Sequence, residues 1–235
     1  MFFHQHPYKP FIPKNATKLI VGTLPPPRFT TGDLKPDDVN FCYGSRDGQL
    51  WKILDQIFSL NLTFENTESA IQERKNFLIK HNIGICDIVE SAERDKIDAS
   101  DLGMQNVKLR DMIWYLQEYP KVDTLLFTGG NSKNGPEYFF RRYLKDYNLK
   151  LQVVSDNVPR IHEFRLPTKS NLSHRAESRC DTSLRTIKTI SLTAPSGAAN
   201  RAVGSMDLYK QLKTQNPDFN TFDFRVMQYR AFFLD

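Results

Sequence analysis

A short apolar run, Leu19 to Val21, ends abruptly at Gly22 and is followed by three consecutive prolines at positions 25–27. An apolar run bounded by turn residues is typical of a buried β-strand. Proline has no N–H group and a fixed φ, so residues 25–27 cannot continue a central strand and should form a stiff loop. In open α/β sheets, ligands bind beyond the carboxyl ends of the strands. The stretch therefore predicts either a pocket wall or an ordinary strand with a proline-rich connection.

Apolar runs of this kind alternate along the chain with segments of helical periodicity. Further strands are expected at residues 82–89, 123–130, 149–155 and 187–192, and helices at 49–58, 67–81, 107–118, 136–147 and 198–214. Residues 1–17 are expected to wrap the surface, 90–95 to form a charged loop, and an aromatic-rich tail to end the chain. Strands that alternate with helices indicate a parallel sheet covered on both faces. We expect an α/β fold, a three-layer αβα sandwich around a short, mainly parallel sheet of four to five strands.

Composition is that of an ordinary soluble domain. The 235 residues are 40% hydrophobic and 25% charged, which is enough for one domain over residues 1–235. No apolar run reaches the ~18 residues of a membrane span, and the first residues do not resemble a signal peptide. Three scattered cysteines form neither a disulfide framework nor a metal-ligand pattern, so a reducing, cytoplasmic location is expected. The net charge of +5 and pI of 9.0 favour polyanionic partners.

One segment, residues 159–185, interrupts the alternation of strands and helices. It is rich in arginine, histidine and small polar residues and contains few apolar ones. We interpret it as a basic, polar insertion in the domain. Either it is solvated, or it forms a basic lobe that faces phosphates.

Familiar catalytic motifs are absent from the sequence. There is no Gly-x4-Gly-Lys-Ser/Thr phosphate loop, no Gly-x-Gly-x-x-Gly after the first strand and no Gly-x-Ser-x-Gly elbow. The five histidines include no pair with zinc-binding spacing. We therefore expect no metal-dependent site.

Five loops that follow the expected strands would meet at one edge of the sheet, residues 22–28, 41–47, 87–91, 129–133 and 193–201. In these loops and the strands before them the chain resembles the uracil-DNA glycosylase superfamily, most closely its hypoxanthine-DNA glycosylase and mismatch-specific branches. The resemblance is carried by residues 19–25, 41–51, 83–91 with Glu93 and Arg94, 126–131 and 192–200. It covers about residues 17–205.

The resemblance implies an αβα sandwich that hydrolyses an N-glycosidic bond in DNA without a cofactor. Such an enzyme must flip the target nucleotide into a pocket. The residues implied to surround the base are Gly22, Thr23, Leu24, Pro25, Tyr43 or Phe41 as a stacking ring, Asp87 as the reader of the base edge, and Asn131. The residues implied to contact the DNA backbone are Pro26, Arg28, Ser196, Gly197, Asn200 and Arg201.

The chain departs from the family at the catalytic positions. Many relatives carry Asp or Asn where this chain has Leu24, and the hypoxanthine branch carries Asn where this chain has Gly48. We therefore predict that Asp47 positions water and stabilises the oxocarbenium-like sugar; its alternative role is to cap the following helix. Asn40 and Ser45 are the reserve candidates. The last motif has Thr193 and Ala194 where some relatives place a histidine.

Asp87 carries information about the substrate. An ionised carboxylate accepts hydrogen bonds and cannot donate them, so it suits the exocyclic amine of a cytosine-type base better than the carbonyl of uracil. This favours a deaminated purine or a modified cytosine over plain uracil. Alternatively, Asp87 caps a helix or pairs with Arg94.

The sequence therefore predicts a monofunctional DNA glycosylase that excises a damaged, deaminated or modified base and leaves an abasic site. Two other readings stay open: a catalytically lapsed nucleic-acid-binding protein on the same fold, and a hydrolase of free nucleosides. A monomer that acts on duplex or single-stranded DNA is expected. Whether such an enzyme serves repair or defence against foreign DNA with modified bases is a question that the residues leave open.

Overall fold

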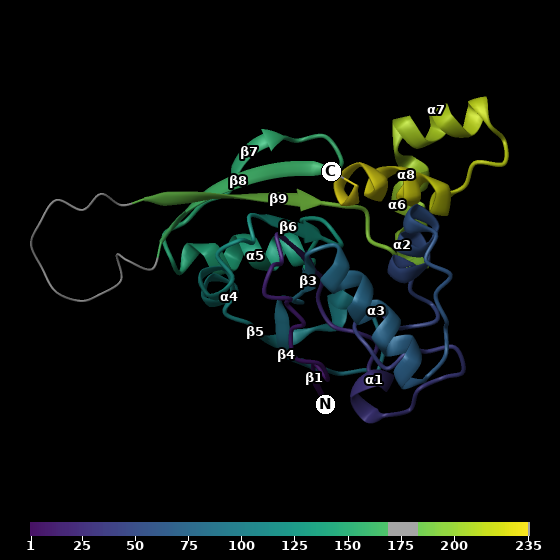
Figure 1. Ribbon diagram of the computed structural model, residues 1–235, viewed down its shortest axis with the longest axis horizontal. Helices are drawn as coiled ribbons and strands as arrows, with labels where there is room; N and C mark the ends of the chain where they lie inside the picture. The colour runs from purple at the N-terminus through teal and green to yellow at the C-terminus, as the bar shows by residue number, and fades with distance from the viewer. Residues whose placement is uncertain (169–182, 235) are drawn as a thin grey trace, which may run out of the picture.

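The computed structural model describes residues 1–168 and 183–234 of the chain. Its central sheet has six strands in the order β3-β2-β6-β9-β8-β7 (Figure 1). The parallel strands are β3 (Ile83–Ile85), β2 (Lys18–Val21), β6 (Thr124–Phe127) and β9 (Leu184–Ser191), and the antiparallel ones are β8 (Arg160–Pro167) and β7 (Gln152–Ser155). The prediction of a mainly parallel sheet is confirmed, and the prediction of four to five strands is wrong.

The additional strand is β8, which lies in the segment expected to be a polar insertion. It pairs with β9 over its whole length, from Arg160 opposite Ser191 to Pro167 opposite Leu184. Phe164 and Leu166 are buried in alternation with more exposed residues, which is the period of a strand with one face on the core. Both ends of the stretch 159–185 therefore belong to the sheet, and residues 169–182 lie outside the described part of the chain.

A second, antiparallel sheet was not expected. It consists of β1 (Phe2–Gln5), β4 (Val89–Arg94) and β5 (Gln105–Leu109), with β4 in the middle. The N-terminal segment therefore starts as a strand, and residues 90–95 are largely a strand instead of a charged loop. The helix expected over residues 107–118 is shorter and begins at Met112, because residues 105–109 pair with β4.

Helices cover both faces of the central sheet. On one face, α4 (Met112–Glu118) and α5 (Pro136–Lys145) pack against Leu19 and Val21 of β2 and against Leu125 of β6. On the other face, α2 (Leu50–Phe58), α3 (Glu68–Lys80) and α8 (Thr221–Phe233) pack against Ile20 and Leu126. Adjacent residues of one strand thus enter opposite cores, because strand side chains alternate between faces.

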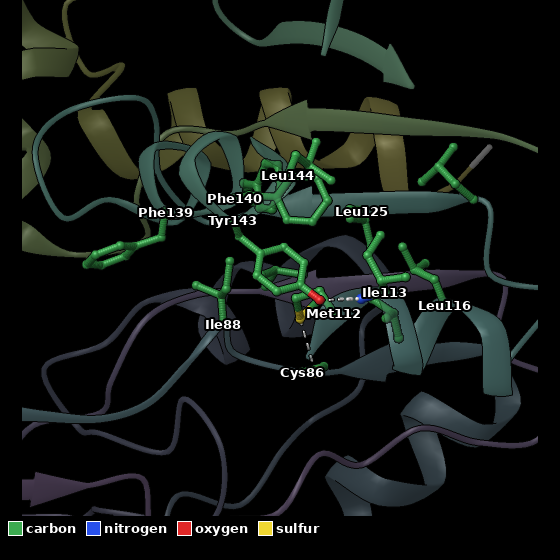
Figure 2. Packing of buried hydrophobic residues seen from close by; sticks show 14 of the residues in the cluster. Cys86, Ile88, Met112, Ile113, Leu116, Leu125, Phe139, Phe140, Tyr143 and Leu144 are labelled. Atoms are coloured by element: carbon green, nitrogen blue, oxygen red, sulfur yellow. Dashed lines mark hydrogen bonds between the residues drawn. The ribbon is translucent and has the colours of Figure 1, made fainter. Parts of the chain in front are cut away.

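In the core beneath α4 and α5, the hydroxyl of Tyr143 connects α5 to the start of α4 (Figure 2). Its hydroxyl accepts a hydrogen bond from the main-chain nitrogen of Ile113 at 3.0 Å and donates one to Oδ1 of Asp111 at 2.5 Å. In the same cluster, Sγ of Cys86 lies 3.7 Å from Sδ of Met112. Cys86 immediately precedes Asp87, so this packing fixes the chain at the point where it leaves the sheet.

The C-terminal quarter differs most from expectation. The single helix expected over residues 198–214 is three elements, a 3-10 turn at Gly197–Ala199, α6 (Asn200–Ser205) and α7 (Asp207–Gln215). The expected tail is α8, whose start is fixed by a capping box between Asn220 and Asp223. Two short elements complete the fold, α1 (Arg28–Thr31) after the prolines and a 3-10 turn at Asp101–Gly103.

Candidate active site

A cavity of about 310 Å³ opens where the parallel strands end. It is walled by the proline loop at residues 22–28, by the turn at 43–49, by Asp87 and Asp101, by Thr128 after β6, and by residues 194–198 after β9. Binding sites in α/β sheets lie at this edge because loops from neighbouring strands converge there. Four of the five loops expected to converge do line this cavity, and the loop at 129–133 lines an adjacent one.

Asp87 lies in the cavity wall, 6% exposed, with its carboxylate held by three donors. Oδ1 accepts from the main-chain nitrogen of Gly22 at 2.7 Å and from the hydroxyl of Tyr43 at 2.8 Å. Oδ2 lies 2.9 Å from Nε2 of His6. Because Nδ1 of His6 accepts from the main chain of Tyr8, a neutral His6 carries its proton on Nε2 and donates it to Asp87.

The wall beside Asp87 is closely packed. A Cβ at Gly22 would lie 2.2 Å from the Tyr43 hydroxyl and 2.9 Å from Oδ1 of Asp87, so only glycine fits. Tyr43 itself has a left-handed φ of 58°, and its hydroxyl is also 3.0 Å from Oγ1 of Thr128. Burial, followed by the charge of Asp87, raises the pKa of Tyr43 well above its usual value. The tyrosine is therefore a neutral donor to the carboxylate.

A second carboxylate, Asp101, faces the cavity from the turn after β4. Its Oδ1 accepts a hydrogen bond of 2.8 Å from Oγ1 of Thr23. Burial raises the pKa of Asp101 to about 6, although the Thr23 bond and Arg94 act in the opposite direction. Asp101 also lines an adjoining cavity of about 330 Å³, which shares Gly22, Thr23, Thr128 and Ala194 with the first. Sequence reasoning missed Asp101, since nothing in its neighbourhood distinguishes it from the surrounding polar residues.

Asp47 lies at the rim of the cavity with 65% of its side chain exposed. Nη2 of Arg28 is 3.2 Å from its Oδ2 and also donates to Oγ of Ser45 at 2.8 Å. The same arginine makes a two-pronged pair with buried Asp38 at 2.7 and 2.8 Å. The N-cap of α2 is Gln49, without a side-chain cap, so the alternative role of Asp47 as helix cap is wrong. Arg28 connects the proline loop to the turn at 43–49.

The last wall of the cavity is held by α8. Arg225, which is fully buried, donates to the main-chain oxygens of Ala194 at 2.8 Å and Ser196 at 2.9 Å. Gln228 accepts from the nitrogen of Thr193 at 2.7 Å. The loop after β9 therefore has a fixed backbone, and the residues that fix it come from the segment expected to be a tail.

Most residues implied by the family resemblance lie around this cavity, and some do not. Those that line it are Gly22, Thr23, Leu24, Pro25, Pro26, Arg28, Tyr43, Ser45, Asp47, Asp87 and Ser196. Phe41 packs in the core against Trp51, 6.2 Å between ring centroids, so it is not available to stack on a base in the cavity. Asn40 is exposed and accepts from Tyr8, and Asn131 lines the adjoining cavity. Gly197 and Arg201 are exposed beside the cavity, while Oδ1 of Asn200 accepts from Thr221 and Arg225.

The cavity is lined by the carboxylates of Asp47, Asp87 and Asp101, groups that can take part in acid–base chemistry. Among residues 1–168 and 183–234, no three His, Cys, Asp or Glu side chains are grouped to hold a metal ion. Asp87 has no ion pair with Arg94; the arginine donates to His4 at 2.8 Å instead. Over the same ranges, no helix has the length and apolar character needed to cross a membrane.

Of three comparisons with known proteins, one finds a likeness, and that likeness concerns the fold. No protein-family model matches the chain, and no curated protein is significantly similar to it. Among solved structures, the chain is similar to a solution NMR structure of a protein from Methanosarcina acetivorans that is provisionally named a uracil DNA glycosylase. The TM-score is 0.50 at 14% sequence identity, over 95% of this chain and 98% of that one. The likeness shows a uracil-DNA-glycosylase-like fold.

Proposed function

We propose that the protein is a DNA glycosylase that hydrolyses the N-glycosidic bond of a flipped nucleotide and leaves an abasic site. The observation that carries the proposal is the cavity at the carboxyl ends of the strands, with Asp87 held in its wall by Gly22, Tyr43 and His6. Its place in a uracil-DNA-glycosylase-like fold and the net charge of +5 support a DNA substrate.

The acceptors in the cavity favour a base that presents donors. Oδ1 of Asp87 has two donors and Oδ2 has one, which orients the carboxylate and leaves lone-pair capacity on Oδ2. The amide oxygen of Gln49, another residue of the lining, is buried without a hydrogen-bond partner. An exocyclic amine would supply donors to these acceptors, and so would a ring N–H; uracil presents a single ring N–H flanked by two carbonyls, which are acceptors themselves. We therefore propose a modified cytosine or a deaminated purine as the excised base.

Asp47 is the proposed stabiliser of the sugar cation. An oxocarbenium-like transition state carries positive charge at the sugar, and an anion at the rim of a base pocket lowers its energy. Arg28 and Ser45 hold the turn on which Asp47 lies. Leu24, in the place where many relatives carry an acid, lines the cavity as an apolar residue and cannot take that part.

Incubation with oligonucleotides tests the proposal. Duplex and single strands that bear uracil, hypoxanthine, xanthine or modified cytosines are treated with the protein, and alkali cleavage reports abasic sites. We expect a product from at least one base, and a loss of about a hundredfold in Asp47→Ala. The matched control is Asp33→Ala, an exposed residue whose carboxylate accepts from Thr31 outside the cavity.

Two other outcomes define the alternatives. DNA binding without a product from any base would favour a lapsed glycosylase, the reading that Leu24 and Gly48 suggest. Cleavage of free nucleosides but not of DNA would favour a nucleoside hydrolase. Comparison of damaged bases with bases found in modified foreign DNA separates a role in repair from one in defence.

A further inference from the structure

We propose that Asp101 is the general base of the reaction, the group that takes a proton from the attacking water. The inference rests on the proposed glycosylase function and adds to it a catalytic residue. Asp101 lies in a loop that was not among the five loops expected to form the site. Its position in the structure carries the assignment.

Asp101 lies on the boundary between the two adjoining cavities. Together with Gly22, Thr23, Thr128 and Ala194 it lines both. A base bound against Asp87 in the first cavity would place its sugar toward this boundary, and the second cavity offers room for water on the other side. A carboxylate at the junction can contact both the sugar and the water.

Asp101 is held by one hydrogen bond to its carboxylate and by two hydrogen bonds to the backbone around it. Oγ1 of Thr23 donates to Oδ1 at 2.8 Å. Nδ2 of Asn134, a residue 5% exposed, donates to the main-chain oxygen of Asp101 at 2.9 Å. Nη1 of Arg94 donates to the main-chain oxygen of Ser100 at 2.5 Å, one residue before. A group with a supported backbone and one supported oxygen is oriented for proton transfer, and its second oxygen is left for water.

The charges around Asp101 suit a base that works near neutral pH. Burial raises its pKa to about 6, the charge of Asp87 acts in the same direction, and Thr23 and Arg94 oppose them. Asp98, on the same loop, lies 3.7 Å from Nη1 of Arg94. At pH 7 the carboxylate is therefore mostly ionised, yet basic enough to accept a proton, which is the condition for efficient general-base catalysis.

The proposed hydrolysis requires only water and the side chain of Asp101, and no cofactor. Water gives one proton to Asp101, and its oxygen forms the new bond to C1′ of the sugar. The C1′–N bond breaks, and its electron pair leaves with the base, which takes a proton from solvent. Asp101 then returns its proton to solvent. Asp47, which is more exposed and already paired with Arg28, keeps its proposed role toward the sugar cation.

The test measures single-turnover excision of the best substrate between pH 5 and pH 9. We expect Asp101→Asn to lower the rate constant about a hundredfold or more, the usual contribution of general-base catalysis, while DNA affinity stays within about threefold. In the wild type the rate should rise with pH through a limb near pH 6, and the variant should lack this limb. Asp95→Asn, an exposed residue a few positions earlier whose carboxylate accepts from Gln105, is the matched control and should keep both rate and limb.

A second pair of variants separates catalysis from a purely structural role. Thr23→Val removes the hydrogen bond that lowers the pKa of Asp101, so the limb should move to higher pH, whereas Thr23→Ser should keep it in place. If Asp101→Asn retains the wild-type rate and limb, or if Thr23→Val leaves the limb where it was, the assignment of Asp101 is wrong and the glycosylase proposal stands. If the wild-type protein excises no base, both the assignment of Asp101 and the glycosylase proposal are wrong.

Discussion

The main-chain nitrogen of Gly22 donates a hydrogen bond of 2.7 Å to Oδ1 of Asp87, 65 residues further along the chain. This contact joins the ends of two neighbouring parallel strands, β2 and β3, at the point where both leave the sheet. The next residue, Thr23, binds the other acid of the cavity, Asp101. Two consecutive residues of one loop thus orient two carboxylates, and the separation between the acids is fixed by the backbone between Gly22 and Thr23.

Replacement of Gly22 by alanine should damage both site and fold. The new Cβ would lie 2.2 Å from the Tyr43 hydroxyl, so the tyrosine must move and its bond to Asp87 must break. We expect unfolding in urea to show a loss of about 1–3 kcal/mol, as for overpacked cores, and excision to fall below detection. Gly197→Ala is the control: nothing lies within 4 Å of its Cβ, and its stability should change by less than about 0.5 kcal/mol. Equal effects of the two changes would contradict the packing argument.

Tyr43→Phe should leave Asp87 in place but remove one of the hydrogen bonds that orient its carboxylate. The change removes a donor to a buried carboxylate and a partner of Thr128, and an unmet buried group of this kind costs about 1–3 kcal/mol. We expect that loss of stability in urea, and a rise in KM larger than the fall in kcat, because base recognition is affected first. Tyr8→Phe, which removes a hydrogen bond to exposed Asn40, should cost less than about 0.5 kcal/mol.

Asp38 should make the protein sensitive to acid. Burial raises the pKa of Asp38, but the hydrogen bonds from Arg28, Arg46 and Lys35 outweigh it and lower the pKa to about 2. Because the folded pKa is below the unfolded one, near 3.9, the stabilisation is fully present above about pH 4 and is lost as the pH falls toward 2. Its size is about 2 kcal/mol. In Asp38→Asn, urea unfolding should show this loss at pH 7 and a flatter pH dependence between 4 and 2.

The exposed residue Asp156 provides the control for Asp38. Asp156→Asn should leave both the stability at pH 7 and the slope at low pH within error of the wild type. A slope that is equally steep in Asp38→Asn and wild type would show that the acid transition arises elsewhere in the chain.

Arg225→Met should release the loop at residues 193–200 from α8. The guanidinium is buried and donates to four oxygens, those of Ala194, Ser196, Thr221 and Asn200. A buried acceptor that loses its donor costs up to about 1–3 kcal/mol. We expect a loss of about 2–4 kcal/mol in urea and faster amide hydrogen exchange in the loop. Arg230→Met on the exposed side of the same helix should change neither, and protection that survives in Arg225→Met would refute the anchoring role.

Much of the architecture could be predicted because strands appear in the sequence as short apolar runs and helices as apolar residues at helical spacing. Residues 18–21, 83–85 and 124–127 are short apolar runs, and all three are parallel strands of the six-stranded sheet. The helix at Glu68–Lys80 was predicted within a residue at each end, and its cap Thr67 accepts from the nitrogen of Ala70. The strand β8 was missed because charged residues alternate with its buried ones, so that composition masked the period.

The site was predictable where loops follow strands and where the family resemblance supplied residues. Gly22 and Asp87 could be placed together because parallel strands end at one edge, whereas Tyr43, between α1 and α2, was placed there by the resemblance. His6, Asp101 and Arg225 could not be placed, since each reaches the site through tertiary packing of a segment with no pattern of its own: the residue after an N-terminal strand of a second sheet, a 3-10 turn, and an aromatic helix with no apolar stripe. The place of Phe41 was also mispredicted, because an aromatic residue next to a turn suits the hydrophobic core as well as it suits a pocket wall.

The wall of the cavity draws on residues near both ends of the chain. His6 secures Asp87 from the start of the sequence, and Arg225, Gln228 and Tyr229 secure the loop at residues 193–196 from near its finish. During synthesis the sheet strands β2, β3 and β6 emerge long before α8 does. The wall of the cavity can therefore be complete only after α8 has been synthesised and has packed against the loop that follows β9.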